Sequence, residues 1–127
     1  MRNRSRGGFY NGELGDYEEL DFQQKMKAVA ARTDVTLRKR VADIFYEVTS
    51  QYMLHLPGDL DRLSMQVSDA VVGLSTAGPT IIADAIRLVV QAETGWTEEQ
   101  TIKHIGINLM PYINAALAAE NRKGILR

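Results

Sequence analysis

Apolar positions between residues 59 and 93 recur at helical spacing and predict two helices joined by a break. Gly78 and Pro79 form this break, because glycine accepts left-handed dihedral angles and proline suits the first turn of a helix. In the first helix the apolar residues lie three and four positions apart, which places them on one face. These residues are Leu60, Leu63, Val67, Ala70 and Leu74.

The second of these helices, which begins at Pro79, is apolar on nearly every side. Such a helix must be buried, either in the core of its own chain or against a copy of itself. Its two central charges, Asp84 and Arg87, lie three residues apart and mark the one edge of the helix that is exposed to solvent. The residues that we expect at an interface between copies are Ile82, Ile86, Val89 and Val90.

Helical periodicity also covers residues 17–54. We predict one helix at about 17–32 and a second at about 35–54, with Thr33 or Asp34 as the cap of the second. The apolar stripe continues almost in phase through the break, so one long helix is the competing prediction. We favour two helices, because a helix of more than about 25 residues is uncommon in a globular protein.

Residues 97–100, Thr-Glu-Glu-Gln, match a capping box and predict the start of another helix. Asn108 can cap a last helix, which accepts Pro111 in its first turn. The sequence therefore predicts an all-α fold: a compact bundle of five to six helices formed by residues 17–127 as a single domain.

Residues 1–16 show neither helical nor strand periodicity and predict a flexible basic arm. Arg2, Arg4 and Arg6 precede the first acidic residue, and Phe9 and Tyr10 follow them closely. Guanidinium groups pair with phosphates and aromatic rings stack on bases, so this composition favours contact with a nucleic-acid strand. An ordinary frayed terminus is the alternative interpretation.

A second basic cluster stands near the start of the helix at 35–54. A helix N-terminus already offers free amide hydrogens to an anion, and nearby cations strengthen such a site. The alternative is a solvated surface on which Lys39 pairs with Asp43 one turn later. The residues of the predicted phosphate contact are Arg32, Arg38, Lys39 and Arg40.

Composition narrows the function further. The 127 residues carry a net charge of −1 and include no cysteine, which excludes disulfides and thiolate chemistry. The two histidines, His55 and His104, lie far apart in the sequence and lack the spacing of zinc ligands or of a nucleophile–base pair. We therefore expect no enzyme activity, no metal site and no cofactor.

We expect neither a signal peptide nor a membrane span. Residues 1–16 lack the apolar segment that a signal peptide needs. The uncharged run at residues 70–83 is too short to cross a bilayer and contains Gly78 and Pro79. A soluble protein, cytoplasmic or associated with a virion, is the expectation.

Residues 95–117 resemble the helix-turn-helix of DNA-binding regulators, with Gly106 in the position of the tight turn. The sequence departs from that pattern at Thr101 and Ile102, where the family has an apolar and a small residue respectively. The positions that would read bases include Asn108 and Asn114 but little else that can donate hydrogen bonds.

The pattern as a whole favours a non-enzymatic, self-assembling structural protein, a virion or coat-like subunit. It would pack against copies of itself through apolar helices and contact DNA or RNA through its N-terminal arm. The helix-turn-helix regulator is the first alternative, and an adaptor that binds another protein through an apolar groove is the second.

Overall fold

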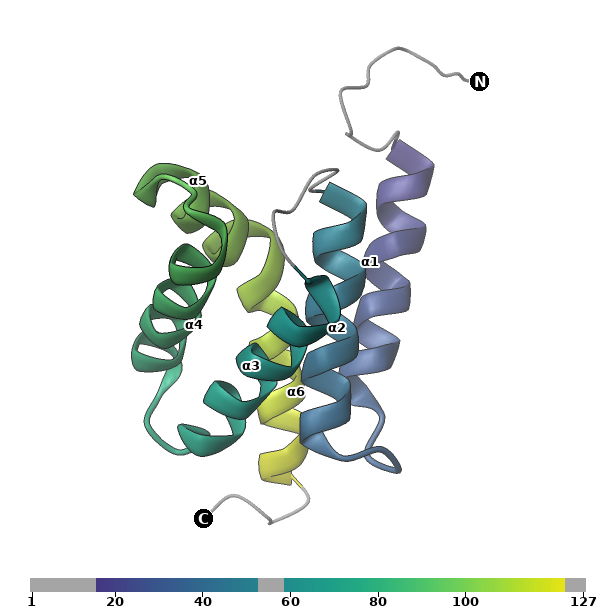
Figure 1. Cartoon of the computed structure of the whole chain (residues 1–127). Coiled ribbons are helices and arrows are strands. Elements are labelled where there is room, and N and C mark those ends of the chain that lie inside the picture. The colour runs from purple at the N-terminus through teal and green to yellow at the C-terminus, as the bar shows by residue number, and fades with distance from the viewer. Residues whose placement is uncertain (1–15, 53–58, 123–127) are drawn as a thin grey trace.

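The computed structural model describes residues 16–52 and 59–122, and all regular structure in these ranges is helical (Figure 1). This confirms the predicted all-α fold. The predicted arm, except for Asp16, lies outside the described residues. The elements are α1 (Asp16–Ala31), α2 (Leu37–Tyr52), α3 (Leu60–Gly73), α4 (Pro79–Thr94), α5 (Glu98–Ile102), the π-helix η1 (Lys103–Leu109) and α6 (Met110–Arg122).

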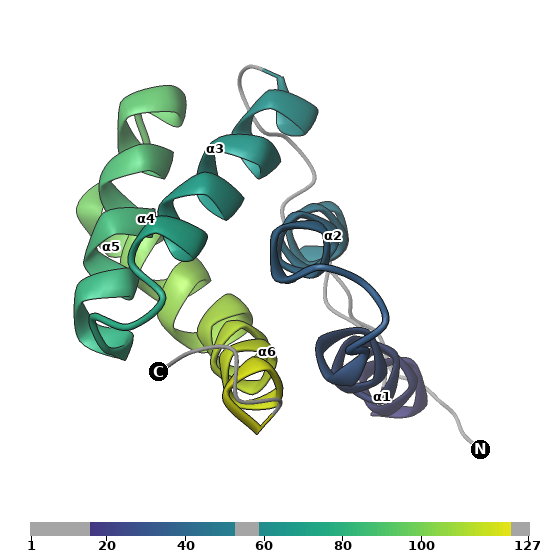
Figure 2. The same cartoon turned by 90° about the horizontal axis from the view of Figure 1, so that it is seen from below.

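Helix α2 lies at the centre of the bundle, where it contacts α1, α3, α6 and η1. Helix α6 packs against both α1 and α2, and Figure 2 shows these three helices nearly end on. Helix α3 crosses this group and joins it to α4, which also contacts α5 and η1. Helix α4 lies on the outer side of α3.

One apolar core joins residues of every helix except the short α5. Its largest fully buried apolar side chains include Phe45 from α2, Leu63 from α3 and Ile113 from α6. The face of α3 that is buried contains Leu63, Val67 and Val71, so the helix is rotated slightly from the predicted stripe. Burial of such a face is what holds helices of this length, because isolated helices of fewer than about 15 residues are marginal in water.

The predicted break between the first two helices is confirmed, but its cap is a different residue. Helix α2 begins at Leu37, and the hydroxyl of Thr36 accepts a hydrogen bond of 3.1 Å from the amide of Lys39. Thr36 therefore caps the helix, in place of Thr33 or Asp34.

Local signals set the starts of two other helices as predicted. The side chain of Thr97 accepts from the amide of Gln100 at 3.1 Å, and the side chain of Gln100 accepts from the amide of Thr97 at 2.9 Å. Gly78, with φ of 102°, directly precedes Pro79 at the start of α4. Gly95 ends that helix with φ of 71°, a backbone conformation that residues other than glycine rarely adopt.

The prediction for the last two helices is wrong in one respect, because no break separates them. Helical structure runs continuously from Glu98 to Arg122 through η1, and Gly106 lies inside η1. Asn108 therefore caps no helix, and the tight turn that a helix-turn-helix needs at Gly106 is not formed. None of the helices in the described ranges combines the length and apolar character needed to cross a membrane.

Candidate assembly and nucleic-acid surfaces

Three of the four predicted cations near the start of α2 lie on the surface, each beside a carboxylate. Lys39 pairs with Asp43 at 2.8 Å, as the alternative interpretation of this cluster predicted. Arg38 pairs with Asp69 of α3. An incoming phosphate must therefore compete with a carboxylate at each of these cations.

The loop before α2 holds the third surface pair. Arg32 and Asp34 meet at 3.0 Å, and both side chains are more than half exposed. Their hydrogen bond raises the pKa of Arg32 and lowers that of Asp34. Contact of Arg32, Arg38 and Lys39 with phosphate stays a prediction.

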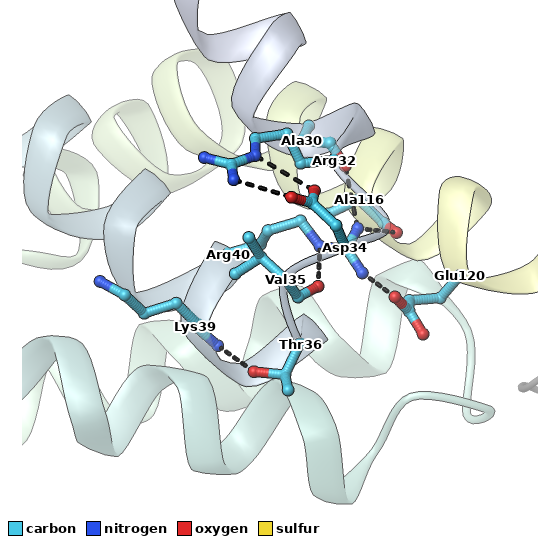
Figure 3. Close-up of polar contacts among 9 residues, drawn as sticks. All are labelled: Ala30, Arg32, Asp34, Val35, Thr36, Lys39, Arg40, Ala116 and Glu120. Carbon is cyan, nitrogen blue, oxygen red and sulfur yellow. Dashed lines mark hydrogen bonds and ion pairs between the residues drawn. The ribbon is translucent and has the colours of Figure 1, made fainter.

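The fourth cation, Arg40, is buried, and the prediction that it contacts nucleic acid is wrong. Its guanidinium forms an ion pair with Glu120 of α6 (Figure 3). It also donates to the carbonyl oxygens of Ala30 at 2.9 Å, Val35 at 3.1 Å and Ala116 at 3.3 Å. Only 1% of the residue is exposed, so no phosphate can reach it.

This buried arrangement joins three parts of the fold. Arg40 lies on α2, Ala30 lies in the last turn of α1, and Ala116 and Glu120 lie on α6. Desolvation by burial lowers the pKa of Arg40, while the negative charge of Asp34 raises it. A guanidinium remains protonated at neutral pH, so its burial requires these partners.

The cations of the predicted arm, Arg2, Arg4 and Arg6, lie outside the described residues. The sequence nevertheless shows how charge is divided between the described residues and the remaining ones. Residues 16–52 and 59–122 contain ten Lys or Arg and fifteen Asp or Glu, a formal charge of −5 against −1 for the whole chain. The remaining residues therefore carry a net charge of +4.

Three of the four residues predicted at an interface between copies are buried within their own chain. Ile82, Ile86 and Val90 lie in the core, on the side of α4 that contacts α3, α5 and η1. Val89 is half-buried and packs against the same core. The interface prediction is therefore wrong for Ile82, Ile86 and Val90, because the chain itself covers them.

The opposite face of α4 remains apolar and exposed. Ile81 is 52% exposed and Leu88 is 69% exposed, and their spacing of seven places them on one side of the helix. Half-buried Ala85 and exposed Ala92 continue this stripe. We call the four residues Ile81, Ala85, Leu88 and Ala92 the α4 stripe.

The two charges expected at the wet edge of α4 lie beside this stripe. Asp84 and Arg87 form an ion pair within the helix, and both side chains are at least one-third exposed. The third charged residue of α4, Glu93, pairs with Arg62 of α3. The exposed face of α4 is therefore neutral as a whole.

A buried histidine in η1 connects that element to α2. The Nε2 atom of His104 lies 3.2 Å from the hydroxyl of Thr49, and its Nδ1 atom lies 3.5 Å from the amide nitrogen of Asn108. The ring of Trp96 meets the histidine ring edge-on, with 5.8 Å between the ring centroids. Burial lowers the pKa of His104 to about 4, so the ring is neutral at pH 7.

Sequence reasoning missed this cluster because Thr49 lies 55 positions from the histidine. The π-helical turns were the signal that a sequence pattern could not show, although such turns recur at functional sites. His55 lies outside the described residues. Within the described ranges, no group of three or more histidine, aspartate and glutamate residues gathers in a way that could hold a metal ion.

A shallow groove of about 610 Å³ lies between the α3–α4 turn and α6. Pro79 and Leu117 supply apolar surface to it, and the side chains of Ser75, Thr76, Asn114 and Asn121 supply polar groups. No charged residue is among those that line it. Grooves of this size and lining suit an uncharged, mostly apolar ligand or peptide.

Comparison with known proteins adds no family to this description. No protein-family model, no curated protein and no solved structure matches the chain.

Proposed function

We propose that this protein is a non-enzymatic structural subunit that associates with copies of itself and contacts the backbone of nucleic acid. The observation that carries this proposal is the α4 stripe, which stays exposed after the rest of the helix has entered the core. Contiguous exposed apolar surface beside polar residues is typical of a protein–protein interface. Virion and coat proteins combine self-association with nucleic-acid contact, which is an analogy of design.

The division of charge supports the nucleic-acid part of the proposal. A body with a formal charge of −5, whose cations at the start of α2 are already paired, attracts a polyanion weakly. Arg2, Arg4 and Arg6 contribute most of the positive charge outside that body. Contact with nucleic acid would therefore depend on the arm, with Arg32, Arg38 and Lys39 in a secondary role.

Light scattering of the full chain, with and without a mixed-sequence oligonucleotide, tests both parts. We expect the particle mass at high micromolar protein to exceed that of one chain and to increase further when the oligonucleotide is added at low salt. The matched control is Leu88→Glu, which places a charge in the α4 stripe and should give a smaller particle with an unchanged helical circular dichroism spectrum.

A monomeric wild-type protein at high micromolar concentration would contradict the self-association. Failure of the oligonucleotide to bind at low salt would contradict the nucleic-acid contact. In either case the groove between the α3–α4 turn and α6 would become the favoured candidate for the functional surface.

That groove favours a second candidate function, an adaptor that binds an uncharged, apolar peptide segment of another protein. Its specific support is the absence of charge among its lining residues, together with the apolar surface of Pro79 and Leu117. Ala118→Arg, at the exposed edge of the groove, should abolish binding of such a peptide without unfolding the protein. If peptide libraries yield no binder that depends on Ala118, the adaptor function fails.

A further inference from the structure

We propose that residues 123–127 fold back onto their own chain and cover the groove between the α3–α4 turn and α6. Such a contact goes beyond the functions proposed above, because it gives the groove an occupant and needs no second molecule. Residues 123–127 read Lys-Gly-Ile-Leu-Arg and lie outside the described residues.

The chain leaves α6 at the rim of this groove. Helix α6 ends at Arg122, and the residue before it, Asn121, lines the groove. Figure 1 shows the end of α6 on the same side of the molecule as the α3–α4 turn, which forms the other wall. The residues that follow Arg122 therefore start beside the groove.

The length of the 123–127 segment matches the length of the groove. The part of α6 that lines the groove extends from Asn114 to Asn121, which is about 10 Å along the helix axis. Five extended residues reach up to about 16 Å, so the segment can turn back and cover this distance. The reversal requires a residue that accepts left-handed dihedral angles just after the helix, and Gly124 stands two positions after Arg122.

The apolar residues of the segment match the lining of the groove. Ile125 and Leu126 are adjacent in the sequence, and Pro79 and Leu117 offer them apolar surface. No charged residue lines the groove, so nothing in it requires a charged ligand. The cations at the two ends of the segment can keep their charged groups in water.

Polar groups in the groove suit a peptide backbone. The N–H and C=O groups of a covered segment lose water and need new hydrogen-bond partners. Four polar side chains of the groove make no hydrogen bond among the described residues and can supply them: Ser75, Thr76, Asn114 and Asn121. The lining therefore favours a peptide segment over a purely apolar ligand.

The covalent connection favours residues 123–127 over any other uncharged peptide. The groove by itself would accept many such peptides, but this segment is joined to its rim. A short linker gives a local concentration in the millimolar range, so a free peptide at micromolar concentration must bind about a thousandfold more tightly to compete. The groove is therefore covered first by its own chain, and a partner protein must displace residues 123–127.

Limited proteolysis tests whether the segment is held in the groove. An endoprotease specific for lysine can cleave after Lys123, and its rate follows the fraction of chains in which this site is free. Ala118→Arg blocks the exposed edge of the groove, creates no new lysine and should speed this cleavage by about tenfold or more. Ala31→Arg is the matched control, because Ala31 is also exposed but lies at the end of α1, and it should leave the rate unchanged.

Ile125→Ser combined with Leu126→Ser removes the apolar side chains of the segment and leaves the folded helices untouched. This double variant should be cleaved after Lys123 as fast as Ala118→Arg, once the rates are corrected with synthetic peptides of the two sequences. Cleavage of the wild type, Ala118→Arg and the double variant at one common rate would overturn the proposal.

Cysteine pairs test where the segment lies. The chain has no cysteine, so the introduced pair Thr76→Cys and Leu126→Cys forms a disulfide within one chain only when the segment reaches the groove. The control pair is Asp34→Cys and Leu126→Cys. Asp34 lies in the loop that Arg40 connects to α6, on a different side of this helix from the groove (Figure 3).

We expect the pair with Thr76→Cys to form its disulfide at least about tenfold faster than the control pair. Equal rates would mean that residues 123–127 do not prefer the groove. A disulfide between two chains, seen as a doubled mass under non-reducing conditions, would place the segment in another copy and would equally overturn the proposal. Neither result depends on the nucleic-acid contact or the α4 stripe, so the two proposals fail separately.

Discussion

At the scale of single residues, the structure assigns Arg40 to the fold and leaves its neighbours on the surface. Arg38 and Lys39 lie in the same helical turn as Arg40, yet their side chains are at least half exposed while Arg40 is buried against Glu120. The sequence showed four cations close together but not their directions relative to α6. Glu120 lies eighty positions away, and only the packing of α2 on α6 brings it to Arg40.

Arg40→Met should lower the free energy of unfolding by about 3–5 kcal/mol, because it removes the guanidinium that forms a buried ion pair with Glu120. Urea denaturation measures this loss. Combining Arg40→Met with Glu120→Leu should recover most of it, since no unpaired charge then remains.

Arg38→Met, two positions earlier in the same helix, is the matched control and should change stability by no more than about 0.5 kcal/mol. An equal loss of unfolding free energy for Arg38→Met and Arg40→Met would mean that the buried ion pair contributes no more to stability than the exposed one.

His104 predicts a dependence of stability on pH. Its pKa is about 4 in the folded protein and about 6.5 when unfolded, so the unfolded chain binds more protons between these values. The free energy of unfolding should therefore fall by about 3 kcal/mol as pH decreases from above 6.5 to 4. Fluorescence of Trp96, the one tryptophan of the chain, reports the unfolding beside His104.

His104→Leu removes this titrating group and should make the difference between pH 7.5 and pH 4.5 smaller by most of that amount. A variant whose stability falls with pH as steeply as the wild type would show that other groups cause the dependence.

At the scale of elements, local sequence signals predicted where most helices begin. The break at Gly78 and Pro79 and the capping box at Thr97 both depend on residues within one turn of the helix end. The sequence was less informative for η1, because a π-helical turn depends on how His104 and Leu109 pack against other helices. It also could not tell which face of α4 the chain itself covers.

Ile86→Ala and Leu88→Ala compare the two faces of α4. Ile86 is fully buried, so its truncation should cost about 2–5 kcal/mol of unfolding free energy. Leu88 is mostly exposed, and its truncation should change the stability of the monomer by about 0.5 kcal/mol or less. Thermal denaturation at low protein concentration separates this effect from any association. Similar losses at both positions would contradict the orientation of α4.

Two glycines should respond in opposite directions to alanine. A Cβ atom at Gly106 would meet nothing within 4 Å, and its φ is not positive, so Gly106→Ala should stabilise the helix by about 0.5–1 kcal/mol. Gly95 has φ of 71°, and Gly95→Ala should destabilise the protein by about 1–2 kcal/mol. Denaturant midpoints measure both, and destabilisation by Gly106→Ala would indicate that η1 requires glycine.

At the scale of the whole molecule, charge and apolar surface lie in different places. The described body is acidic and presents its α4 stripe, whereas the residues outside it carry the excess of positive charge. Composition alone could not show this division, because the two charges nearly cancel in the net value of −1.

Removal of residues 1–8 deletes three arginines and no acidic residue. Phosphate contacts release counterions, so the logarithm of affinity for nucleic acid falls linearly with the logarithm of salt concentration. The truncated protein should show a slope that is flatter by up to about three phosphate contacts, with unrelated sequences affected alike. Fluorescence anisotropy over a salt series measures the slope.

The truncated protein should keep the melting temperature of the full chain, which excludes a loss of folding as the cause. Equal affinity of the truncated and intact proteins would show that residues 1–8 do not contact nucleic acid.

The ion pair between Arg40 and Glu120 also constrains the order in which this chain can fold. A nascent chain that has emerged only as far as α4 has no carboxylate from α6 with which to bury Arg40, so α1 and α2 cannot complete their packing. Contacts this distant in sequence form late, because a long loop must close before they gain any energy. The apolar faces of α1 and α2 that pack on α6 must therefore stay partly unburied during synthesis until α6 arrives, and a chain interrupted before Glu120 would be prone to aggregate.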